Sequence, residues 1–131
     1  MNKTIDNLFV TYKIAKELKE KGFDIPCFGY YYNDGRLFHP LRFNISSSEQ
    51  YELYAPTYQQ VEDWLRENHN IEIQIDNYHN KTDNWSYRLL NIVLSEDYNL
   101  DYESNHDNIY FPTYYQAKEK AIEHILKNYI K

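Results

Sequence analysis

The five histidines are the residues that could most directly serve catalysis or bind a metal ion. They are scattered along the chain at His39, His69, His79, His106 and His124. None follows the His-x-His or His-Glu-x-x-His spacing that brings two imidazoles onto one metal ion. His79 lies between Asp76 and Asp83 in an expected turn, where carboxylates could gather. Ordinary turn chemistry is the favoured interpretation there, and a metal site is the alternative.

An acidic stretch, residues 95–107, imitates part of a calcium-binding loop. Oxygen-bearing side chains occupy alternate positions at Asp97, Asn99, Asp101 and Glu103. However, Tyr102 occupies the position at which such a loop requires glycine, and Asn108 stands where a bidentate glutamate belongs. A solvated acidic loop is therefore the preferred interpretation. The sequence predicts no metal site and no cofactor.

Nucleophilic chemistry also lacks its usual signals. Cys27 is the only cysteine, which excludes an internal disulfide, and it lies in the apolar run "IPCFGY". A lone cysteine in such a run is typically a buried, unreactive thiol. No Gly-x-Ser-x-Gly turn is present, and the three glycines are too widely spaced for a phosphate-binding loop. A protein without catalytic activity is therefore favoured.

Tyrosine is the most unusual part of the composition, with fifteen tyrosines and six phenylalanines in 131 residues. In the run "FGYYY", strand geometry places Phe28, Tyr30 and Tyr32 on one face and Tyr31 on the other. Rings on a sheet can hold a planar ligand, and nearby arginines can bind its phosphate. The candidate ligand-binding set is Tyr30, Tyr32, Arg36, Arg42, Tyr54, Trp85, Tyr87 and Arg88. The alternative is that these rings form the core of the sheet and its rim.

The charge distribution bears on partners and location. The formal net charge is −6, and the stretch from Ser95 to Asp107 has five acidic residues and no Lys or Arg. Because proteins that bind long nucleic acids need a basic face, no such partner is expected. The opening residues "MNKTIDNLFV" lack an apolar signal core, and no apolar run reaches membrane-spanning length. A cytoplasmic protein without membrane contact is expected.

Three copies of Thr-Tyr predict three helix starts. Thr11, Thr57 and Thr113 are suitable N-caps, because a threonine hydroxyl can accept a hydrogen bond from the first helical turn. Gln60 and Gln116 stand at capping-box spacing after the second and third caps. The predicted helices span residues 12–21, 58–68 and 114–129, and Gly22 is expected to end the first.

Between these helices the hydrophobic period changes to two. In "CFGYYYNDGRLFHPLRF", the Asp34-Gly35 pair predicts a hairpin turn. "IEIQID" alternates isoleucines with polar residues, which is typical of a half-buried strand. Residues 85–94 form the longest strand candidate, and residues 51–54 predict a short strand.

The order helix–hairpin–helix–hairpin–helix predicts an α+β fold. We expect two helix-plus-β-hairpin units and a closing helix, with one antiparallel sheet of four or five strands packed against three helices. The length predicts a single domain, residues 1–131. The recurring Thr-Tyr suggests an internal repeat of residues 9–54 and 55–110, followed by a closing helix at 111–131. Independent use of a good cap residue is the alternative explanation.

Four stretches carry a resemblance over nearly the whole chain: "TYKIAKELKEKGFDIPCFGYY", "APTYQQVEDWLRENHNIEI", "NWSYRLL" and "TYYQAKEKAIEHIL". With these, the sequence resembles an uncharacterised family of small proteins known from gut bacteria and their phages. The resemblance implies an accessory protein carried by a phage or mobile element. It implies no activity and no functional residues.

Two functions follow as expectations. The first is a non-enzymatic binding protein that sequesters a small nucleotide-like ligand, such as an immune signal of the host, and so acts against host defence. The second is a protein–protein interaction module that binds a host protein or self-associates into a homo-oligomer, because tyrosine is enriched at interfaces. Turnover of a nucleotide would reveal an enzyme instead.

Overall fold

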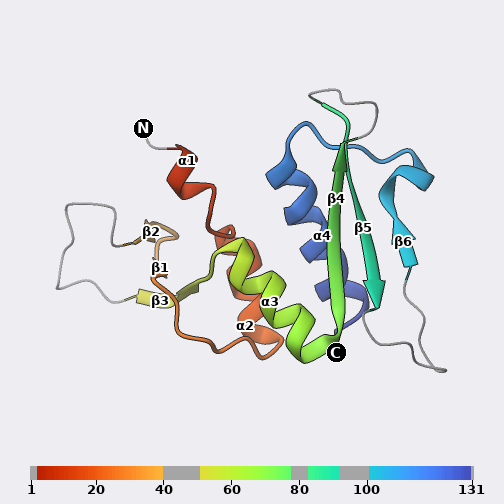
Figure 1. Ribbon diagram of the computed structural model, residues 1–131. Helices are drawn as coiled ribbons and strands as arrows, with labels where there is room; N and C mark the ends of the chain where they lie inside the picture. Colours follow the sequence, from red (N-terminus) through yellow and green to blue (C-terminus); the bar gives the residue numbers. More distant parts are fainter. Residues whose placement is uncertain (1–2, 40–50, 78–82, 92–100, 131) are drawn as a thin grey trace. The chain divides into compact units, whose positions relative to one another are not determined.

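The computed structural model describes residues 3–39, 51–77, 83–91 and 101–130 (Figure 1). Within them the chain combines α-helices with antiparallel strands, so the fold is α+β. The chain divides into two compact units, residues 1–61 and 62–131. The division falls inside helix α3 (Tyr58–His69). Each unit has its own sheet and its own helix packed on that sheet.

The first unit contains α1 (Lys3–Asp6), α2 (Tyr12–Glu20) and a three-stranded antiparallel sheet. Its strands are β1 (Gly29–Tyr32), β2 (Leu37–Phe38) and β3 (Tyr51–Ala55), in the order β2-β1-β3. Helix α2 packs against β3. Strand β1 therefore forms the centre of this sheet, and α2 covers one of its faces.

Local sequence signals define both ends of α2. The Thr11 hydroxyl accepts a hydrogen bond from the Ile14 N–H at 3.3 Å, as expected for an N-cap. At the other end Gly22 adopts a φ of 98°, and the Phe23 N–H donates to the Leu18 carbonyl at 3.0 Å. This left-handed glycine lets the chain fold back and buries Phe23 against the helix.

The hairpin between β1 and β2 has a three-residue loop, residues 33–35. The Gly35 N–H donates to the Tyr32 carbonyl at 2.9 Å, and the Tyr32 N–H donates to the Arg36 carbonyl at 3.0 Å. Gly35 has a φ of 86°, which other residue types seldom adopt. The Asp34-Gly35 pair therefore closes the hairpin that the sequence predicts.

The face of the first sheet that meets α2, called here its inner face, is apolar. Tyr31 and Leu53 lie opposite each other in the register and are both buried. The Tyr31 hydroxyl donates to the Val10 carbonyl. Two residues before Tyr31 on β1, Gly29 is in contact with Phe9, whose ring stacks on the buried ring of His39.

The second unit contains β4 (Ile71–Asn77), β5 (Trp85–Asn91), β6 (Asp101–Glu103), the 3-10 helix η2 (Ser104–Asp107) and α4 (Tyr114–Asn128). The strands form an antiparallel sheet in the order β4-β5-β6. Helix α4 packs on β5 and β4. The apolar side chains of these elements are buried: Ile71, Ile73, Tyr87, Leu89, Ala121, Ile122 and Ile125.

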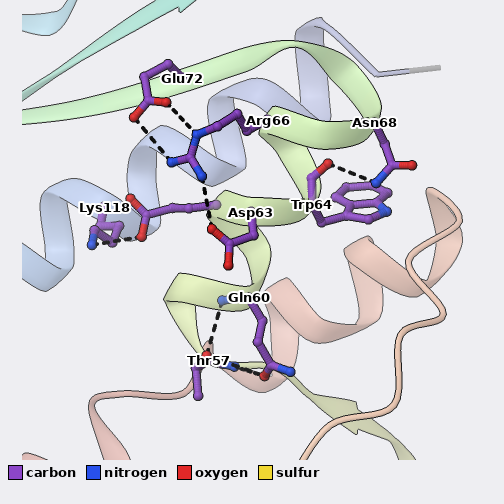
Figure 2. A network of polar contacts seen from close by, with 9 residues as sticks. Thr57, Gln60, Asp63, Trp64, Arg66, Asn68, Glu72 and Lys118 are labelled. Atoms are coloured by element: carbon purple, nitrogen blue, oxygen red, sulfur yellow. Dashed lines mark hydrogen bonds and ion pairs between the residues drawn. The ribbon is translucent and has the colours of Figure 1, made fainter.

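Polar contacts fix α3 at its start (Figure 2). The Gln60 N–H donates to the Thr57 hydroxyl at 3.2 Å, and the Thr57 N–H donates to Gln60 Oε1 at 2.9 Å. These two bonds form the predicted capping box.

Further along α3, ion pairs link it to other elements of the second unit (Figure 2). Arg66 lies between two carboxylates, with Nε 2.8 Å from Glu72 and Nη1 3.0 Å from Asp63. The ammonium of Lys118 on α4 lies 3.1 Å from Glu62, and both of these side chains are nearly buried. Within the second unit, α3 is therefore tied to both β4 and α4.

The three predicted helices are confirmed, each within one residue of its predicted end. The predicted hairpin, the "IEIQID" strand and the short strand at 51–54 are confirmed as well. The described strands form two sheets of three, where we expected one sheet of four or five. Part of the acidic stretch is a strand and a 3-10 helix rather than a loop, because residues 101–103 pair with β5. The single domain and the internal repeat stay predictions.

Candidate functional site

The face of the first sheet turned away from α2 carries a row of aromatic rings. In the register Tyr30 on β1 lies directly opposite Phe38 on β2 and Tyr54 on β3. Residues paired in this way project from the same face of a sheet. Each of the three strands therefore contributes one ring to a single row. Together with Tyr32, these residues are called the aromatic face below.

Within the aromatic face, the rings of Tyr30, Phe38 and Tyr32 contact one another. The centroid of Tyr30 lies 4.5 Å from that of Phe38 and 5.8 Å from that of Tyr32. Tyr32 and Phe38 also meet edge to face at 6.4 Å. Tyr32 is buried, whereas the other three rings are half-buried and keep part of their surface accessible. Phe28, which directly precedes β1, is 76% exposed.

A guanidinium group stands at the hairpin end of the aromatic face. Arg36 places its guanidinium carbon 5.1 Å from the centroid of the Tyr32 ring, a cation–π distance. Its Nε donates to Asp34 at 2.6 Å, and both side chains are more than half exposed. Hydrogen bonds from the backbone N–H and side chain of Arg36 hold the pKa of Asp34 below its usual value. The hairpin tip therefore carries an exposed, ionised pair beside the rings.

The corresponding face of the second sheet is built from different residue types. Its described positions alternate with the core residues Ile71, Ile73, Tyr87 and Leu89, and all of them except Ser86 keep part of their surface accessible. They are Glu72, Gln74, Asp76, Ser86, Arg88, Leu90, Asp101 and Glu103, of which only Leu90 is apolar. Such a composition is typical of a sheet face that meets water. The aromatic face of the first sheet departs from this pattern within the same chain.

The predicted ligand-binding set is thus divided between the two sheets. Tyr30, Tyr32, Arg36 and Tyr54 lie on the first sheet or its hairpin, while Trp85, Tyr87 and Arg88 lie on β5 of the second. The eighth member, Arg42, lies outside the described residues. Phe38 belongs to the aromatic face, although the sequence analysis did not select it. Its position directly opposite Tyr30 across the Asp34-Gly35 turn is the signal that could have found it.

The three members on β5 have partners of their own. Trp85 packs edge to face on Tyr114, with centroids 5.6 Å apart. Arg88 forms an ion pair with Asp101 at 3.0 Å. Tyr87 is buried in the core of the second unit, in agreement with the alternative expectation that these rings form the core of the sheet.

The buried Tyr87 lies in a polar cluster that the sequence analysis did not anticipate. Its hydroxyl lies 2.7 Å from Nδ1 of His124 on α4. The Tyr102 hydroxyl donates to Asp107 at 3.1 Å, and the Tyr102 ring meets His124 at 4.5 Å. Burial raises the pKa of Tyr87 and lowers that of His124. At neutral pH both groups are therefore uncharged, which suits a half-buried cluster.

A cavity of about 420 Å³ lies in the first unit, beside the C-terminal turn of α2 and strand β3. Its lining residues are Ala15, Lys19, Gly22, Phe23, Asp24, Leu53 and Tyr54. Only Tyr54 belongs to the set predicted from the sequence. The other lining residues were not predicted, because the cavity depends on how α2 packs against β3. No short stretch of sequence indicates this packing.

Metal and nucleophile chemistry gain no support from the described residues. None of them forms a group of three or more His, Cys, Asp or Glu side chains that could hold a metal ion. His79, Asp97 and Asn99, which the sequence analysis considered, lie outside the described ranges. Burial raises the pKa of the Cys27 thiol to about 11, so at neutral pH it is a thiol rather than a nucleophilic thiolate.

Comparison with known proteins identified no relative of this chain. No protein-family model, no curated protein and no solved structure matches the chain. Among the described residues, no helix combines the length and the apolar character needed to cross a membrane.

Proposed function

We propose that this chain is a non-enzymatic binding protein that holds a small nucleotide-like ligand on its aromatic face. The observation that carries the proposal is the row of rings across three strands, with the Arg36 guanidinium at its hairpin end. The same ligand chemistry explains both features, because a nucleotide joins a planar base to an anionic phosphate.

The accessible rings suit the base. Phe38, Tyr30 and Tyr54 lie side by side across the sheet, so a planar ring can be placed against them without moving the backbone. Stacking of a base on an aromatic side chain contributes roughly 1–3 kcal/mol, and it depends little on which base is present. The row therefore supports recognition of planarity rather than of one particular base.

Arg36 suits the phosphate. Its planar fork of donors can bind two phosphate oxygens at once, which an ammonium group cannot do. In the protein without ligand, one donor of this fork, Nε, is already bonded to Asp34. A phosphate must therefore compete with the Asp34 carboxylate, so the hairpin tip favours ligands with more negative charge than a single carboxylate.

Stacking and charge pairing hold a ligand without converting it. This suits a protein that sequesters a signal rather than one that destroys it. The resemblance to phage and gut-bacterial proteins supports such a role for an accessory protein of a phage or mobile element, which would withdraw an immune signal of its host.

Isothermal titration calorimetry of the full chain tests the proposal. The ligands are cyclic mononucleotides, cyclic dinucleotides and ADP-ribose derivatives, with the matching nucleosides and inorganic phosphate as controls. We expect stoichiometric binding of at least one nucleotide, much weaker binding of its nucleoside, and recovery of the ligand unchanged by chromatography. Absence of heat across the panel would contradict the proposal, and conversion of the ligand would show an enzyme.

The alternative function is a protein–protein interaction module, and one observation favours it. Phe28, directly before β1, is 76% exposed, and Ile25, three residues earlier in the chain, is 38% exposed. A contiguous group of apolar side chains at the surface is characteristic of protein-binding sites, and these two residues lie three positions apart in the chain. Capture of one host protein by the wild-type chain but not by Phe28→Ser would support this function over nucleotide binding. Light scattering of the free chain would reveal self-association.

A further inference from the structure

The cavity beside α2 has features of a small-molecule site, and the proposed function makes no use of it. Its volume of about 420 Å³ lies within the range of sites that enclose small ligands. It is bounded by the C-terminal turn of α2 and by β3, both in the first unit. A β-carbon built on Gly22 would meet no atom within 4 Å, so the space next to this lining residue is open.

The wall of the cavity is largely apolar. Ala15, Phe23 and Leu53 line it, and each is buried in the first unit. Apolar walls of this kind bind the hydrocarbon part of a ligand, because its transfer from water is favourable by about 25 cal/mol per Å². The ligand must therefore present an aliphatic or aromatic group to this wall.

Two opposite charges stand among the lining residues. Lys19 and Asp24 are both exposed, and neither forms an ion pair with another described residue. By contrast, Arg36, Arg66 and Lys118 each pair with a carboxylate. Among the described residues, Lys19 and Asp24 thus have no opposite charge of their own, and together they fit a ligand that carries both signs.

The fold determines which charged group of the ligand each of these two residues can bind. Lys19 lies in the last turn of α2, and Asp24 follows the left-handed Gly22 that ends the helix. The C-terminal end of a helix carries partial negative charge, which favours a cationic group of a ligand. An ammonium group of the ligand beside Asp24 is therefore stabilised by the Asp24 carboxylate and by the C-terminal end of α2. A carboxylate of the ligand is bound by the Lys19 ammonium.

We propose that this cavity is a second binding site, which takes a free α-amino acid with an apolar side chain. The side chain lies against Ala15, Phe23 and Leu53, the carboxylate pairs with Lys19, and the ammonium pairs with Asp24. The site is distinct from the aromatic face, although Tyr54 belongs to both. It does not depend on whether the chain binds nucleotides.

Titration of the ¹⁵N-labelled full chain, followed by NMR, tests this site. The probes are L-leucine and L-phenylalanine, with phenylacetate as an analogue without the ammonium and phenethylamine as an analogue without the carboxylate. We expect saturable shifts of the backbone amides of Gly22, Phe23 and Leu53. Each single-charge analogue should bind several-fold more weakly, since one charge pair at an exposed position is lost. No saturable shift up to millimolar amino acid, or equal binding of the analogues, would overturn the proposal.

Substitutions at two exposed lining residues test whether the amino acid binds in this cavity. Lys19→Glu and Asp24→Lys each reverse one lining charge without changing the buried core, and each should weaken amino-acid binding by about tenfold or more. Lys13→Glu makes the same change on α2 at an exposed residue that does not line the cavity, and should leave binding unchanged. Binding that survives both cavity substitutions, or shifts confined to Tyr30 and Phe38, would overturn the assignment. None of these results would bear on nucleotide binding at the aromatic face, so either proposal can be refuted while the other stands.

Discussion

The aromatic ring of Phe9 occupies the place where a side chain at position 29 would begin. A β-carbon built on Gly29 would lie 2.6 Å from Cε1 of Phe9 and 2.9 Å from the carbonyl oxygen of Ala55. Atoms do not approach so closely without a shift of the surrounding structure. Gly29 therefore lets the segment before α2 pack directly on the central strand of the first sheet.

Substitution of Gly29 by alanine should destabilise the chain. Inserting a methyl group into a packed core typically costs about 1–3 kcal/mol, and here part of the clash is with backbone that cannot rotate away. The free energy of unfolding, measured with urea, should fall by an amount in this range. In a Phe9→Leu background the same substitution should cost less, because the smaller side chain leaves more room. An equal cost in both backgrounds would show that Phe9 is not the obstacle.

The nearly buried ion pair between Glu62 and Lys118 should be the most costly polar contact to break in the second unit. Glu62→Gln leaves the Lys118 ammonium without its carboxylate, and loss of one partner of a buried pair costs about 3–5 kcal/mol. Chemical denaturation of the two proteins measures the difference. Glu123→Gln is the matched control, since its partner Lys120 is 49% exposed and their ion pair should be worth less than about 1 kcal/mol. Equal effects of the two substitutions would contradict the assigned burial.

Stability should depend on pH through His124. Burial lowers its pKa from the ordinary value of 6.5, so the unfolded chain takes up this proton before the folded chain does. The stability that His124 contributes is therefore complete above about pH 6.5 and decreases as the pH falls below it. Unfolding free energies at pH 7.5 and about pH 5 should differ less for His124→Gln than for the wild type. His69, whose pKa burial also lowers, supplies a background slope common to both proteins. The same change of unfolding free energy with pH in both proteins would show that folding does not shift the pKa of His124.

Cys27 should react slowly with alkylating agents. Its pKa of about 11 leaves on the order of one thiol in a thousand ionised at pH 8, so iodoacetamide should modify it about a hundredfold more slowly than free cysteine. The rate should still be rising between pH 9 and 10, as mass spectrometry of timed samples can show. Unfolding in urea is the control, and should restore the rate of an ordinary thiol. Rapid labelling of the folded chain at pH 8 would contradict the assigned burial.

The parts of the fold that could be predicted are those written in short stretches of sequence. The start of α3 depends on Thr57 and Gln60, three residues apart, and the hairpin depends on Asp34-Gly35. Both signals act through hydrogen bonds within one turn. The number of sheets could not be predicted in this way, because strand pairing joins distant residues. Strand β6 was missed for the same reason, since its acidic "DYE" sequence forms a strand only by pairing with β5.

The candidate site shows the same division. Tyr30, Tyr32 and Arg36 come together because one hairpin places them, so the sequence alone could group them. Tyr87 looked equivalent by residue type, yet its hydroxyl is directed to His124, which lies 37 residues away in the chain. Only the packing of α4 on β5 separates a core tyrosine from an accessible one.

The central claim, that the aromatic face binds a nucleotide-like ligand through stacking and Arg36, is tested most directly by a pair of arginine substitutions. Calorimetry is repeated with the ligand that binds the wild-type chain best, using Arg36→Ala and Arg88→Ala. Both remove an arginine from a partly exposed ion pair, but Arg36 lies at the hairpin of the first sheet and Arg88 on a strand of the second. We expect Arg36→Ala to weaken binding by about tenfold or more, since a charge-assisted hydrogen bond is lost, and Arg88→Ala to leave it unchanged. Equal affinities of the two variants would contradict the claim.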